Sequence, residues 1–76
     1  MYVEIVHNGS YFVFPAVQML AWLKGSNTLV VETVSGRHEF TGVDRELWAK
    51  INEYVMPNAA LYINLDKKKV AMLGPF

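Results

Sequence analysis

The Asn8-Gly9 pair is the feature that most constrains the fold of this chain. Before it, residues 2–7 alternate with β-branched side chains, and after it residues 10–14 are again β-prone. Two such runs separated by Asn-Gly are the strongest short-range signal of a β-hairpin, because both residues tolerate the positive φ that a type I′ turn requires. The chain therefore begins with an antiparallel hairpin.

Two further hairpins are predicted in the rest of the chain. Residues 28–34 and 37–41 form β-prone runs on either side of the turn residues Ser35-Gly36. Residues 60–65 and 69–73 form the last pair, with a polar, lysine-containing turn between them. Turn residues flanked by β-prone runs favour antiparallel pairing of the neighbouring strands.

One helix is predicted between the second and third hairpins. Asp44 is suited to cap its start, and the helix runs to about Val55, where Pro57 and Asn58 stop it. Apolar side chains fall at helical spacing in one stripe: Leu47, Trp48, Ile51, Tyr54 and Val55. Such a stripe indicates a helix that packs one face on a core, so we expect Trp48 and Ile51 to be buried.

Residues Ala16 to Lys24 fit two structures. Pro15 is suited to the first position of a helix and Gly25 to its end, yet the apolar residues also alternate as in a strand. The residues Gln, Met, Leu and Ala in this segment favour a short helix. The strand remains the alternative.

Together these elements predict one α+β domain over residues 1–76. Its centre is a small twisted antiparallel sheet of five or six strands, with the amphipathic helix 44–55 on one face. An open, barrel-like curl is the alternative form of this sheet. One helix can cover only one face of the sheet, so the sequence does not predict what covers the other face.

The apolar content is high for so short a domain. Hydrophobic residues make up 53% and charged residues 18% of the chain, whereas charged residues are about 25% of an average globular domain. Either strands with two apolar faces bury the surplus, or part of it forms an interface, because large exposed apolar patches are rare on monomers. We expect an interface, and most simply a homodimer. The candidate interface residues are Tyr11, Met19, Trp22 and Leu23, and Trp22 is expected there rather than Trp48.

Candidate catalytic groups are few. His7 and His38 are isolated, and Glu39 points away from His38 because neighbouring strand residues face opposite sides of a sheet. His38 shares a face with Phe40, which predicts a packed or half-buried imidazole. Without cysteine the chain has no disulfide, thiolate metal site or cysteine nucleophile. We therefore expect no enzyme, no metal site and no cofactor.

A nucleic-acid-binding regulator is the alternative function. Lys67, Lys68 and Lys69 lie at the last hairpin turn, and Arg37 adds to them in this interpretation. Against it, seven basic residues balance seven acidic ones, whereas nucleic-acid-binding domains usually carry a net basic surface. Three lysines at a turn are also typical of a solvated tip that blocks pairing of sheet edges.

One resemblance concerns layout. The stretch from His7-Asn8-Gly9 through Leu29 to Gly36 and on to Gly42 resembles the small bacterial FlbD-like flagellar proteins. It is also similar to LytTR DNA-binding domains, which share the order hairpin, strand with a glycine turn, strand, helix. The basic recognition segment of LytTR domains is not found around Leu61 to Asp66.

The remaining expectations concern location and role. The start of the chain lacks the basic region of a signal peptide, and the longest mostly apolar stretch, Ala16 to Leu23, is too short to span a membrane. Absence of cysteine favours a reducing compartment. We expect a cytoplasmic protein without membrane association. Its expected function is non-catalytic binding of another protein, in the manner of small bacterial or phage regulators, adaptors or inhibitors.

Overall fold

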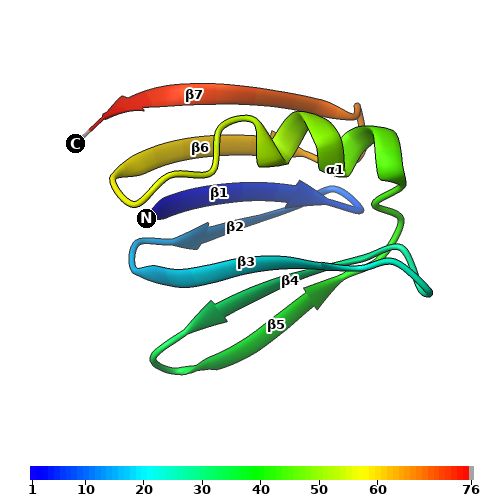
Figure 1. The fold of residues 1–76 in the computed structure, drawn as a ribbon, viewed down its shortest axis with the longest axis horizontal. Helices are drawn as coiled ribbons and strands as arrows, with labels where there is room; N and C mark the ends of the chain where they lie inside the picture. The colour runs from blue at the N-terminus through cyan, green and yellow to red at the C-terminus, as the bar shows by residue number, and fades with distance from the viewer. Residues whose placement is uncertain (76) are drawn as a thin grey trace.

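The computed structural model describes residues 1–75 as seven strands in two sheets and one helix (Figure 1). The four-stranded sheet has the order β2-β1-β6-β7 and the three-stranded sheet the order β3-β4-β5. The elements are β1 (Tyr2–His7), β2 (Ser10–Phe14), β3 (Val17–Leu23), β4 (Thr28–Thr33), β5 (Gly36–Phe40), α1 (Arg45–Asn52), β6 (Ala59–Asn64) and β7 (Lys69–Pro75). The α+β class is confirmed, but the strands form two sheets rather than one, and these do not close into a barrel.

All three predicted hairpins are present. In the first, Asn8 and Gly9 have φ angles of 51° and 78°, as a type I′ turn requires. The register runs from Val3 opposite Phe14 to His7 opposite Ser10. Strands β4 and β5, and β6 and β7, pair antiparallel in the same way.

One strand pair departs from the predicted antiparallel arrangement. β1 runs parallel to β6, with Tyr2 opposite Ala60 and Val6 opposite Asn64. Parallel neighbours need a long crossover, which the whole segment from β2 to α1 supplies here (Figure 1). Turn residues predict pairing only between strands that are adjacent in sequence, so they did not predict the pairing of β1 with β6.

The segment that fitted either a helix or a strand is strand β3, so the helix preference was wrong. β3 pairs antiparallel with β4, from Val17 opposite Thr33 to Leu23 opposite Thr28, with a register shift between Val17 and Met19. The amide of Val17 also donates to the carbonyl of Met1 at 2.7 Å. Backbone pairing with the apolar strand β4 outweighs the weak helix propensity of this segment.

The helix is present but shorter than predicted. Asp44 caps it, with its side chain accepting a hydrogen bond from the amide of Leu47 at 2.8 Å. It ends at Asn52 rather than near Val55. Ile51 is fully buried, as predicted, whereas Trp48 is only half-buried and packs at the rim of the core. This is the one helix among the described residues, and it is too short and too polar to span a membrane.

The core lies between the two sheets and α1. Its buried members are Val3, Ile5, Phe14, Val17, Leu20, Leu29, Val31, Phe40, Val43, Leu47, Ile51, Ala59, Leu61, Ile63 and Leu65. In β1 these side chains alternate with Tyr2, Glu4 and Val6, which face away from the core. The helix and the three-stranded sheet therefore cover the same face of the four-stranded sheet, and its other face is left without a covering layer in residues 1–75.

Candidate interaction surfaces

Strand β2 exposes three consecutive large apolar side chains. Tyr11 is 58%, Phe12 37% and Val13 45% exposed. Tyr11 and Val13 face the uncovered side of the sheet and Phe12 the core side, so both faces of this strand reach the surface. Single exposed apolar residues are ordinary, but a consecutive run of them on one strand indicates a binding surface.

β2 is also a sheet edge without the usual protection. It pairs with β1 on one side, and on the other side its backbone groups have no hydrogen-bond partner among residues 1–75. The other edges carry features that oppose strand addition. β5 carries the ion pair between Arg37 and Glu39 at 3.0 Å. β7 begins with the charged residue Lys69 and has a register shift in its pairing with β6. In β3, the amide of Val17 already donates a hydrogen bond to the carbonyl of Met1. Residues 10–14 contain no charge and no proline.

The uncovered side of β2 is held in place by a carboxylate. Glu4 accepts hydrogen bonds from the hydroxyls of Tyr11 and, at 2.5 Å, of Tyr2. The hydrogen bond to Glu4 raises the pKa of Tyr11 to about 12, and the two tyrosine hydroxyls lower the pKa of Glu4. Tyr11 is thus exposed yet fixed in direction, which reduces the entropy lost on binding.

The core side of β2 is backed by an aromatic cluster. Phe12 lies edge-on to Phe40 with ring centroids 5.2 Å apart, and Phe14 packs on His38 at 4.8 Å. His7 completes the cluster against Phe40 at 5.5 Å. His38 is half-buried in it, the packed environment that the sequence predicted. Among the described residues neither histidine has a carboxylate within ion-pair distance.

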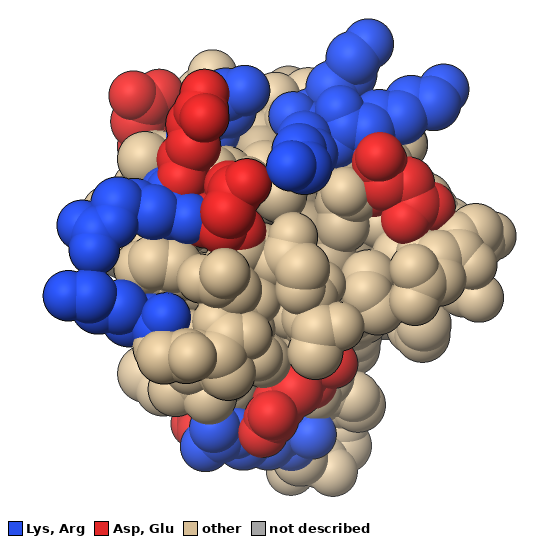
Figure 2. All heavy atoms as spheres, turned by 90° about the vertical axis from the view of Figure 1, so that its right-hand side faces the viewer, with Lys and Arg blue, Asp and Glu red and all other residues tan. Residues whose placement is uncertain are grey.

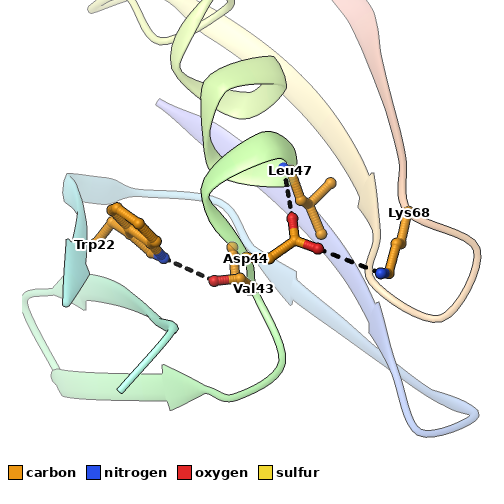
Figure 3. A network of polar contacts seen from close by, with 5 residues as sticks. All are labelled: Trp22, Val43, Asp44, Leu47 and Lys68. Atoms are coloured by element: carbon orange, nitrogen blue, oxygen red, sulfur yellow. Dashed lines mark hydrogen bonds and ion pairs between the residues drawn. The ribbon is translucent and has the colours of Figure 1, made fainter. Parts of the chain in front are cut away.

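The predicted interface residues lie on two different sheets. Tyr11 is on β2, whereas Met19, Trp22 and Leu23 are on β3. Met19 and Leu23 are 46% and 39% exposed. Trp22 is half-buried; its Nε1 donates to the carbonyl of Val43 at 2.7 Å (Figure 3) and its ring stacks on Trp48 at 6.3 Å. The indole therefore joins β3 to the start of α1.

Two depressions adjoin these strands. One, of about 330 Å³, lies between the end of β2 and the β4–β5 turn, and its lining includes Val13, Pro15 and Val34. The other, of about 440 Å³, lies beside β3, and Met1, Met19 and Met56 are part of its lining. Both are apolar and open to the surface, so they extend the exposed apolar area rather than enclose a substrate.

The structure does not bring the basic residues of the nucleic-acid alternative together. Arg37 lies next to the β4–β5 turn, and Lys67, Lys68 and Lys69 lie at the β6–β7 turn, which is at the opposite end of the molecule (Figure 1). Arg37 pairs with Glu39, and the Nζ of Lys68 lies 3.3 Å from Asp44 (Figure 3). On the side that carries the β6–β7 turn, both basic and acidic side chains lie around an uncharged centre (Figure 2).

Sequence reasoning missed Glu4, and although the first hairpin was expected to carry apolar side chains on both faces, it did not place Phe12 and Val13 among the interface residues. The sequence did contain a signal for them. An Asn-Gly turn that pairs His7 with Ser10 also places Val13 directly opposite Glu4, with Tyr11 diagonal to Glu4 on the same face.

In the described part of the chain, no group of three or more His, Cys, Asp or Glu side chains is arranged to hold a metal ion. Comparison with protein-family models, with curated proteins and with solved structures finds no match for this chain. The layout likeness noted above therefore carries no functional argument.

Proposed function

We propose that this protein is a non-catalytic interaction module that binds another polypeptide through the free edge of β2. One observation carries the proposal: β2 is an unprotected sheet edge whose Tyr11, Phe12 and Val13 are exposed in succession. Addition of a strand to such an edge is a common mode of protein recognition, in which backbone hydrogen bonds give affinity and alternate side chains give specificity. Regulators, adaptors and inhibitors act in this way.

The neighbouring contacts support a preformed site. Glu4 fixes Tyr11 on one side of the strand, and Phe40 supports Phe12 on the other. An arriving strand therefore meets Tyr11 and Phe12 already in contact with supporting side chains. Little ordering is needed on this side of the complex, which favours affinity.

The proposal is tested by affinity capture from an extract of the source cells after nuclease treatment. Wild-type protein is compared with Val13→Lys and with Met56→Lys, a matched control because Val13 and Met56 are 45% and 49% exposed. We expect a protein retained by wild type and by Met56→Lys and lost with Val13→Lys. Equal retention by all three, or retention that disappears with nuclease, would contradict the proposal.

A further inference from the structure

We infer that the strand that occupies the β2 edge is β2 of a second copy, paired antiparallel about Phe12. This inference rests on the proposed function and names its partner. The two four-stranded sheets would then continue into one another as a single sheet around a two-fold axis. Closed two-fold pairing is the commonest arrangement of soluble homo-oligomers.

The sequence of β2 is self-complementary in this register. With Phe12 on the axis, Tyr11 of one copy lies opposite Val13 of the other, and Phe12 lies opposite its own equivalent. All exposed apolar side chains of the strand therefore meet apolar side chains. Aromatic residues opposite β-branched ones are among the favourable cross-strand pairs.

Charges do not oppose this pairing. β2 carries none, and the nearest, Glu4 on β1, lies beside Val13. The glutamates of the two copies are separated by three strand spacings, about 14 Å, which exceeds the Debye length of about 8 Å at physiological ionic strength. Each is also held by tyrosine hydroxyls.

The depression at the end of β2 extends the contact. In this register Phe14 faces Ser10 of the second copy, so the Asn8-Gly9 turn of that copy comes to lie over Pro15 and the depression. Val34, which is 82% exposed on the rim, is then covered. A five-residue strand alone is smaller than a standard interface of about 1,200–2,000 Å², and this rim supplies additional apolar area.

Sedimentation equilibrium of the full chain at micromolar concentration tests the association. We expect twice the monomer mass of 8.6 kDa for wild type and for Met56→Lys. Val13→Lys places a charge opposite Tyr11 at each end of the strand pair and should raise the dimer Kd at least about tenfold. Circular dichroism of each variant confirms that it is folded. A wild-type monomer, or a dimer unaffected by Val13→Lys, overturns the inference.

Cysteine cross-linking tests the register, because the chain contains no native cysteine. Tyr11→Cys mixed with Val13→Cys should form the mixed disulfide faster than either variant forms a disulfide with itself. Directly opposite residues lie within disulfide reach, whereas equivalent residues lie on the longer diagonal. Met56→Cys is the control and should cross-link slowly. Like-with-like disulfides that form as fast as the mixed one refute the register.

Failure of this inference and failure of the proposed function give different results. If the purified chain is a monomer but Val13→Lys alone loses a captured protein, the β2 edge binds a different partner, and the second-copy inference is refuted. If the chain is a monomer and capture is insensitive to Val13→Lys, both are refuted.

Discussion

The junction between Trp22 and Trp48 allows the strongest test of the structure, through replacement of Trp22 by phenylalanine. This change removes the indole N–H that donates to the carbonyl of Val43 and keeps an aromatic ring against Trp48. Loss of the hydrogen bond costs about 0.5–1.5 kcal/mol, and a weaker ring stack costs about 0.5–1 kcal/mol more. We expect unfolding to become easier by about 1–2.5 kcal/mol, out of a total of about 4–11 kcal/mol for a chain of this length.

Trp48→Phe is the matched comparison. Trp48 takes part in the same ring stack, and its indole N–H donates no hydrogen bond to any of residues 1–75. This change should therefore cost less than Trp22→Phe, about 0.5–1 kcal/mol. The double variant should cost less than the sum of the two single variants, because each change already weakens the one stack.

Urea unfolding of the four proteins at one concentration measures these differences. All four carry Val13→Lys, so that association through β2 does not contribute to stability. Equal costs for the two single changes would refute the hydrogen bond to Val43 as a stabilising contact. Strictly additive costs would refute the stack between β3 and α1.

Three further predictions concern the core and the ionisable groups. Ile51→Ala removes a fully buried side chain and should cost about 2–5 kcal/mol in urea unfolding; a smaller loss contradicts the packing of α1. Tyr11, with its pKa raised from 10.0 to about 12 by the hydrogen bond to Glu4, gives stability that is present below pH 10 and lost as the pH rises toward 12. Glu4→Gln should return the pKa of Tyr11 toward 10.0 in an ultraviolet titration, and an unchanged curve contradicts the contact. The amides of Gly9 and Asn8 lower the pKa of Asp66 below 3.8, so its stabilising effect is present above that pH and lost as the pH falls. Asp66→Ala should therefore make the stability fall less steeply as the pH is lowered, as measured by circular dichroism. An equally steep fall in the variant would contradict the hydrogen bonds from Asn8 and Gly9 to Asp66.

The sequence was informative wherever structure depends on neighbours along the chain. Asn8-Gly9 and Ser35-Gly36 predicted two hairpins, and both form. Asp44 predicted the start of α1. A turn residue or a cap acts on its own backbone and that of the next few residues, so its effect is readable without the rest of the fold.

The sequence was uninformative where a distant segment decides. Residues 17–23 have apolar positions compatible with a helix or a strand, and only the availability of β4 as a partner selects the strand. The parallel neighbour of β1 is β6, more than fifty residues later in the chain. Whether β2 is an edge or an inner strand depends on the partner of β3, which pairs with β4 in the other sheet and not with β2.

The exposure of β2 follows from the topology of the fold. β1 lies between β2 and β6, so further growth of the sheet occurs at β7 or at β2. After β2 only Pro15 and Ala16 precede β3, which leaves for the other sheet, and proline cannot donate a hydrogen bond to extend the strand. All later elements pack either on the core face of the four-stranded sheet or, as β6 and β7 do, on the side of β1 away from β2 (Figure 1). No segment of residues 1–75 is left to pair with β2, and a strand whose Tyr11, Phe12 and Val13 are apolar is hidden from water most completely by a strand from another molecule.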